Sequence, residues 1–139
     1  MSNIDFIKRE MTFNQSLEKV WQAITDPQQI AQWFGDSAVF ELREGAEGYF
    51  EWRTQCEGKY AMKVVSVNPE NYFAYQWMND PDVPFEASGA TLVEWTLKPT
   101  VSGKTHLVLI ESGFKQKSHR QMNIQGWLQE LGHLAQHLA

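Results

Sequence analysis

The chain has 139 residues, of which 42% are hydrophobic and 21% are charged, a composition typical of one globular domain and not of a disordered segment. Its formal net charge of -5 argues against nucleic acid as a partner, because phosphates attract clustered Lys and Arg. No apolar run reaches membrane-spanning length, and the first residues lack a basic-then-apolar signal pattern. We therefore expect a cytoplasmic protein without a membrane span, with a single domain over residues 1–139.

Several kinds of chemistry have no matching motif in the chain. Cys56 is the only cysteine, which excludes an intramolecular disulfide and a cysteine-based metal site. Gly45 and Gly48 do not form a phosphate-binding loop, since they lead into an expected strand and not into a helix N-terminus. No serine stands in a nucleophile-elbow sequence. We therefore expect no metal and no cofactor, and binding in preference to catalysis.

The N-terminal part of the chain predicts one strand followed by two short helices. The strand covers residues 4–13. Ser16 can cap a first helix, and Asp26-Pro27 favours the start of a second helix, which Gly35 ends. The apolar side chains of the first helix recur at i, i+3, i+4 and i+7, at Leu17, Val20, Trp21 and Ile24.

The middle of the chain shows strand-like alternation interrupted by turn residues. Six strands are expected, at residues 38–42, 49–53, 59–67, 72–78, 91–98 and 105–111. With the first strand this gives seven, and turns this short join antiparallel neighbours. Alternation predicts four inward-pointing sets of side chains: Phe50 and Trp52; Phe73, Tyr75 and Trp77; Val93, Trp95 and Leu97; Leu107, Leu109 and Glu111.

The last segment predicts one long amphipathic helix from about residue 118 to the end of the chain. Its apolar stripe consists of Ile124, Trp127, Leu128, Leu131, Leu134, Ala135 and Leu138. A helix of this length must lie across the concave face of the sheet to bury that stripe. The expected fold class is therefore α+β, a curved antiparallel sheet of about seven strands around a long C-terminal helix, with two short helices between the first two strands.

Short motifs along the chain resemble one family of proteins. In chain order they are Val20-Trp21, Thr25-Asp26-Pro27, Trp33-Phe34-Gly35, Gly48-Tyr49-Phe50, Val67-Asn68-Pro69, Phe73-Ala74-Tyr75-Gln76-Trp77, Glu111-Ser112-Gly113-Phe114, Gly126-Trp127 and Leu131. Together they resemble the family of activator of heat shock protein 90 ATPase homologues, which belongs to the START-like or SRPBCC superfamily with its helix-grip fold. The resemblance covers nearly the whole chain, although Glu47 stands where the family usually has the first of two glycines.

The resemblance implies a cavity between the sheet and the long helix. It brings no shared catalytic motif, because the superfamily includes lipid carriers, polyketide cyclases and co-chaperone domains. The side chains expected to line the cavity are Trp33, Phe34, Phe50, Trp52, Tyr75, Trp77, Trp95, Leu97, Leu109, Glu111, Phe114, Trp127 and Leu131. The residues alone leave open whether these aromatic rings surround a ligand or form a dense core.

Two sets of polar residues are candidates for chemistry. Alternation points Glu111 inward, where its carboxylate could orient a ligand hydroxyl or amine or act as a general acid; the alternative is a hydrated side chain at the strand end. Glu130, His133 and His137 have a helical spacing that could present three ligands to zinc. We favour a solvated helix face for these three residues, because nothing in the sequence supplies the surroundings of a metal site.

The function expected from these observations is non-catalytic binding of a small hydrophobic or amphipathic molecule between the sheet and the C-terminal helix. One alternative is a co-chaperone role in the stress response, in which a chaperone is the partner and its ATPase is activated; it is implied by the resemblance alone. Another is a cyclase or aromatase type of enzyme with Glu111 as acid or base. The sequence leaves open whether the protein is a monomer or a homodimer.

Overall fold

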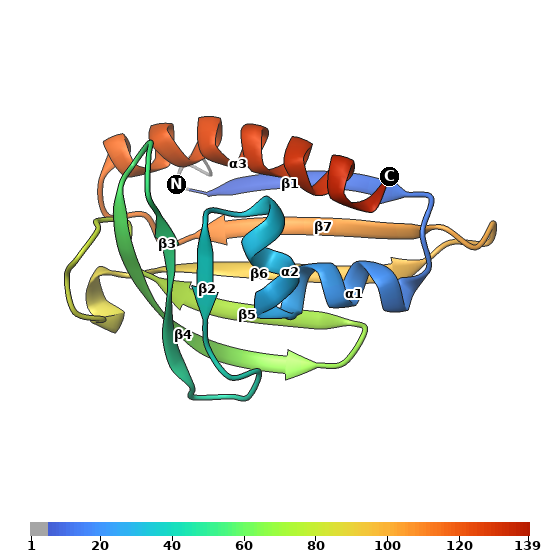
Figure 1. Ribbon diagram of the computed structural model, residues 1–139, viewed down its shortest axis with the longest axis horizontal. Coiled ribbons are helices and arrows are strands. Elements are labelled where there is room, and N and C mark those ends of the chain that lie inside the picture. Colours follow the sequence, from blue (N-terminus) through green and yellow to red (C-terminus); the bar gives the residue numbers. More distant parts are fainter. Residues whose placement is uncertain (1–5) are drawn as a thin grey trace.

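A strongly curved antiparallel sheet holds three helices on its concave side (Figure 1). The computed structural model describes residues 6–139. The strands are β1 (Ile7–Phe13), β2 (Ser37–Val39), β3 (Glu47–Trp52), β4 (Gly58–Asn68), β5 (Tyr72–Trp77), β6 (Thr91–Pro99) and β7 (Thr105–Ser112). The helices are α1 (Leu17–Thr25), α2 (Pro27–Trp33) and α3 (Lys117–Leu138), with a short 3₁₀ helix η1 (Ala87–Gly89) before β6. The expected α+β helix-grip architecture is confirmed.

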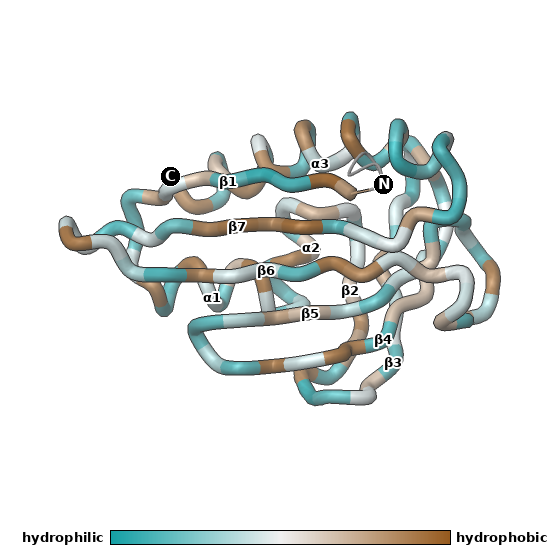
Figure 2. The backbone as a smooth tube through the Cα atoms, turned by 180° about the vertical axis from the view of Figure 1, so that it is seen from behind, coloured by the Kyte–Doolittle hydropathy of each residue, from teal (hydrophilic) through white to brown (hydrophobic). Residues whose placement is uncertain are grey.

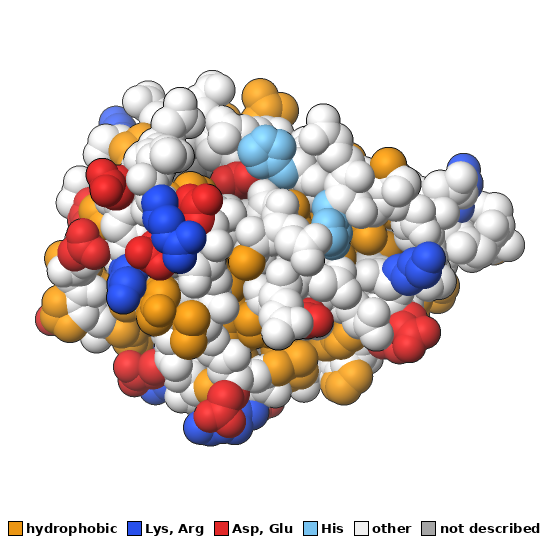
Figure 3. All heavy atoms as spheres, in the orientation of Figure 1, with side chains coloured by type: hydrophobic (Ala, Val, Ile, Leu, Met, Phe, Trp, Pro, Cys, Tyr) orange, Lys and Arg blue, Asp and Glu red, His pale blue; other side chains and the backbone are white. Residues whose placement is uncertain are grey.

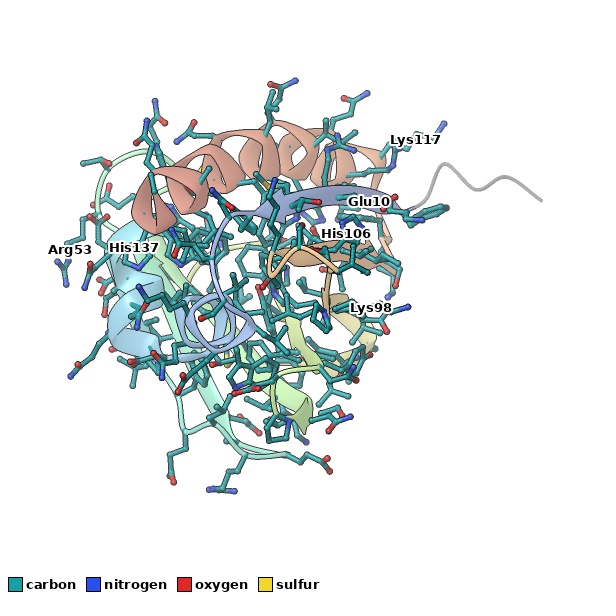
Figure 4. All side chains as sticks on the ribbon, turned by 90° about the vertical axis from the view of Figure 1, so that its right-hand side faces the viewer. Glu10, Arg53, Lys98, His106, Lys117 and His137 are labelled. Atoms are coloured by element: carbon teal, nitrogen blue, oxygen red, sulfur yellow. The ribbon has the colours of Figure 1, made fainter. Side chains whose placement is uncertain are left out.

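The spatial order of the strands is β1-β7-β6-β5-β4-β3-β2, so the chain forms a meander from β2 to β7 and closes with β1 against β7. Seen from behind, β1, β7, β6 and β5 lie in front and the helices behind them (Figure 2). The β1–β7 pairing places Thr12 opposite His106, next to Glu10. The His106 ring lies 3.0 Å from Glu10 on the outer face (Figure 4).

Acidic and basic side chains are mixed on the face shown in Figure 3.

The helix starts follow the expected capping chemistry. The Ser16 hydroxyl accepts a hydrogen bond from the Lys19 amide at 3.2 Å, and the Asp26 carboxylate accepts one from the Gln28 amide at 3.0 Å. Gly35 follows α2 with a φ of +72°, and a Cβ there would lie 2.8 Å from the backbone oxygen of Glu51. Glycine is therefore required where the chain leaves α2 and passes β3.

Some boundaries differ from the expectation. The first strand was expected from residue 4, but residues 4 and 5 lie outside the described part of the chain. The second expected strand, residues 38–42, is the three-residue β2, because the chain turns at Arg43, whose amide bonds to the Glu41 carbonyl. Phe40 leaves the ladder and packs on Phe73, with ring centroids 6.1 Å apart.

The apolar stripe of α3 is narrower than expected. Trp127, Leu131, Leu134 and Leu138 are buried, whereas Leu128 is 66% exposed. The prediction that Leu128 is buried was therefore wrong, because the sheet covers only the helix face centred on Leu131 and Leu134. Within residues 6–139 no helix has both the length and the hydropathy to cross a membrane.

Aromatic rings fill the space between the middle of the sheet and α3. Trp95 and Trp127 meet edge to face with centroids 5.6 Å apart, and both are almost fully buried. Phe34 lies 5.2 Å from Phe50 and 5.3 Å from Trp127. Such contacts are those of a packed core. The space around Trp95 and Trp127 is therefore filled by side chains.

Candidate ligand-binding site

A cavity of about 630 Å³ opens between the tip of the β3–β4 hairpin and the N-terminal half of α3, a size typical of small-molecule sites. The hairpin tip rises beside the first turns of α3 in Figure 1. The cavity is lined by Phe34, Trp52, Gln55, Cys56, Tyr60, Trp77, Asn79, Gln121, Met122, Asn123, Gln125, Gly126, Trp127, Leu128, Gln129 and Glu130. The hairpin, the strand ends and the segment of α3 from Gln121 to Glu130 therefore combine to form it.

The inner wall of the cavity consists of aromatic rings. Phe34 stacks on Trp127 at 15° between ring planes and meets Trp52 edge to face at 4.9 Å. Trp77 lies 6.0 Å from Tyr60 and 6.2 Å from Trp127. Since each ring is held by at least two others, the wall is rigid and already shaped before a ligand arrives.

One side of the cavity rim consists of polar, uncharged side chains. Gln121, Gln125 and Gln129 recur every four residues on α3, so their side chains lie on one face of the helix. Gln55 joins them from the hairpin turn. These amides offer both hydrogen-bond donors and acceptors around an aromatic floor, which suits an amphipathic molecule.

A buried carboxylate lies behind the aromatic wall. Glu111 is completely buried, and its Oε1 accepts a hydrogen bond from the Trp127 indole at 2.7 Å. Its Oε2 accepts from the Trp77 indole at 2.8 Å and from the Thr91 hydroxyl at 2.6 Å. The Asn123 amide donates to both oxygens at 3.1 Å. All four partners are neutral donors, which suits a carboxylate because a carboxylate only accepts.

Glu111 therefore organises the wall and does not project into the cavity. Three of its donors, Trp77, Asn123 and Trp127, line the cavity themselves. The Asn79 amide donates to the Thr91 hydroxyl at 2.9 Å, and Asn79 also lines the cavity. The inward direction of Glu111 agrees with the strand alternation, whereas the alternative of a hydrated side chain at the strand end was wrong, because α3 covers the strand end.

Three buried or partly buried tyrosines titrate at high pH. Burial, together with the charge of Glu111, raises the pKa of Tyr75 well above 10.0. Burial also raises the pKa of Tyr60, and burial with the Glu94 hydrogen bond raises the pKa of Tyr72 to about 12. The unfolded chain then releases phenolic protons between pH 10 and 12 that the folded protein retains, so the free energy of unfolding falls as the pH rises through this window.

Absorbance at 295 nm, which reports phenolate, measures this difference. At about pH 11 we expect clearly less phenolate in the folded protein than in the same protein in denaturant, because three of the four tyrosines have a raised pKa. Coinciding titration curves for the folded and unfolded protein would contradict the burial of these phenols.

A second, polar cavity of about 540 Å³ adjoins the first. It is lined by Gln32, Trp33, Gly35, Asp36, Trp52, Thr54, Gln55, Gln129, Glu130, His133, Gln136 and His137. Trp52, Gln55, Gln129 and Glu130 belong to both cavities. The two cavities are thus neighbours along α3, one aromatic and one polar.

Glu130, His133 and His137 were expected on a solvated helix face. Glu130 is instead buried, with 7% of its surface exposed, because Trp52 covers it and donates a hydrogen bond at 3.2 Å. The His133 ring lies 2.8 Å from Glu130, whereas the His137 ring lies 3.1 Å from Gln29. Among residues 6–139 no three His, Cys, Asp or Glu side chains converge on one metal position.

The thirteen residues expected to line a cavity lie in several places. Phe34, Trp52, Trp77 and Trp127 line the aromatic cavity, and Trp33 with Trp52 lines the polar one. Phe114 is half-buried against the core. The others are buried within the core: Phe50, Tyr75, Trp95, Leu97, Leu109, Glu111 and Leu131.

Sequence reasoning missed the polar part of the aromatic cavity. The four-residue spacing of Gln121, Gln125 and Gln129 could have predicted that their side chains lie on one face of the helix. Asn123 stands one helical turn before Trp127, which indicates the same side of the helix. Asn79 lies in a loop, where no periodicity could place it.

Comparison with known proteins assigns the chain to a family. The model of the family described as Activator of Hsp90 ATPase homolog 1-like protein matches residues 14–139. The chain belongs to this family. Its architecture is the helix-grip fold of the START-like superfamily to which the Hsp90 ATPase activator homologues are related. A search of curated proteins found no significant match.

Solved structures agree with the membership in the Activator of Hsp90 ATPase homolog 1-like family. Protein MLL2253 from Mesorhizobium loti is 26% identical over 96% of both chains, with a TM-score of 0.81. DynU16, a protein in the dynemicin biosynthetic locus, is 25% identical, with a TM-score of 0.78; the match covers 96% of this chain and 47% of DynU16. The Aha1 dimer from Colwellia psychrerythraea is 20% identical, and the match covers 96% of this chain and 95% of the Aha1 chain. Its TM-score of 0.75 shows the shared fold.

Proposed function

We propose that the protein binds a small hydrophobic or amphipathic molecule in the aromatic cavity between the β3–β4 hairpin and α3. The observation that carries this proposal is the open volume of about 630 Å³ bounded by rigid rings, with amide groups at its rim. A flat ring system would stack on the partly exposed Trp52 and release ordered water from its face.

The proposal is binding without turnover. Both oxygens of Glu111 are engaged by protein donors, so this acid is not free to exchange a proton with a ligand. The glutamine amides at the rim are not acids or bases at neutral pH. Hydrogen bonding and ring stacking are what this arrangement supports.

Thermal unfolding in the presence of probe molecules tests the proposal. We expect biphenyl and naphthalene to raise the unfolding temperature, by roughly 10 °C at a concentration of one hundred times the Kd. Dodecane, which cannot stack, should have a smaller effect at equal concentration. No shift with any of the aromatic probes would contradict a ligand site in this cavity.

A further inference from the structure

Four residues line both cavities, and two of them, Trp52 and Glu130, form a hydrogen-bonded pair. The indole of Trp52, on β3, donates to Oε2 of Glu130, on α3, at 3.2 Å. Both residues line the aromatic cavity on one side and the polar cavity on the other. A molecule lying in the aromatic cavity against Trp52 therefore lies next to the polar cavity, which begins on the other side of the Trp52–Glu130 pair.

Glu130 holds the imidazole of His133 in one orientation. Its Oε1 lies 2.8 Å from His133 Nδ1, and its Oε2 is taken by Trp52. Because a carboxylate only accepts, the hydrogen of a neutral His133 ring is on Nδ1. The other ring nitrogen, Nε2, then carries a lone pair and accepts hydrogen bonds.

His133 is placed to use that lone pair on a ligand. Its side chain is 49% exposed and lines the polar cavity, and within residues 6–139 its one recorded hydrogen bond is to Glu130. The neighbouring His137 is different, because its Nε2 lies 3.1 Å from the Gln29 amide oxygen, an acceptor. Asp36 and Glu130 add negative charge to the same cavity, which disfavours an anionic group there.

We infer that the polar cavity is a second part of the ligand site, in which His133 Nε2 accepts a hydrogen bond from a hydroxyl group on an aromatic ligand. This inference rests on the proposed function, and it names the ligand class as hydroxylated aromatic molecules. The ring system occupies the aromatic cavity, and the hydroxyl lies past the Trp52–Glu130 pair. His133 contacts the ligand, and Glu130 is the positioning residue behind it.

Three matched probes test the inference: biphenyl, 4-hydroxybiphenyl and biphenyl-4-carboxylate. Binding is followed by titration calorimetry at neutral pH. One added hydrogen bond is expected to make 4-hydroxybiphenyl bind about three- to tenfold more tightly than biphenyl. The carboxylate should bind more weakly than the phenol, because it lacks the hydrogen to donate and meets Asp36 and Glu130.

Variants of α3 assign the effect to one side chain. In His133→Phe the advantage of 4-hydroxybiphenyl over biphenyl should disappear, while biphenyl still binds. His119→Phe is the matched control, since His119 lies on the same helix but lines neither cavity. There the advantage should remain.

Each failure has its own meaning. Equal affinities for biphenyl and 4-hydroxybiphenyl, tighter binding of the carboxylate, or an advantage that survives His133→Phe would overturn the inference while leaving the proposed function intact. Binding of none of the three probes would overturn both.

Discussion

Glu111→Gln is expected to lower the free energy of unfolding by about 3 kcal/mol. Each carboxylate oxygen of Glu111 faces one indole N–H, Oε1 that of Trp127 and Oε2 that of Trp77. An indole N–H can only donate. Whichever way the new amide is turned, its NH₂ group therefore opposes an indole N–H, and a buried donor loses its acceptor.

Urea unfolding followed by tryptophan fluorescence measures this loss. The matched control is Glu10→Gln on β1, whose carboxylate is half-exposed on the outer face beside His106 (Figure 4). We expect little change in the control, because exposed ion pairs contribute little to stability. Similar stabilities of Glu111→Gln and the wild type would show that the carboxylate does not hold the wall together.

The residue pattern predicted the sheet well, because strand alternation depends only on local geometry. It pointed Leu107, Leu109 and Glu111 to the same side, and all three are fully buried. The helix caps at Ser16 and Asp26 could also be predicted from the sequence, since capping involves residues that are neighbours in the chain.

The pattern did not separate packed rings from rings that border open space. Phe50 and Trp52 alternate in the same way on β3, yet Phe50 is 1% exposed and Trp52 lines both cavities. What distinguishes them is the position of Trp52 at the strand end, where the hairpin leans toward α3. That approach depends on the curvature of the whole sheet, which no local pattern encodes.

The burial of Glu130 on α3 is a second feature that the local sequence pattern could not predict. Helical spacing placed Glu130 on the face opposite the apolar stripe and therefore predicted a solvated position. The structure buries Glu130 under Trp52, which is 78 residues away in sequence. The link between the two cavities therefore rests on a long-range contact, which helical spacing could not predict.

The most direct test of a ligand site beneath the hairpin is to fill the cavity from its rim. Gly126 lies on α3 and lines the aromatic cavity, and a Cβ at this position would meet nothing within 4 Å. A phenylalanine side chain therefore has room at residue 126, and we expect its ring to take up part of the space proposed for the ligand. Because glycine disfavours helix, the substitution is expected to leave the fold at least as stable as before.

Gly132 provides the matched control, since it lies on α3 with no atom within 4 Å of a Cβ but lines neither cavity. The decisive measurement is the affinity for biphenyl of the Gly126→Phe and Gly132→Phe variants, by titration calorimetry. We expect Gly126→Phe to weaken binding by at least about tenfold and Gly132→Phe to leave it unchanged. Wild-type affinity in Gly126→Phe would contradict a ligand site between the hairpin and α3.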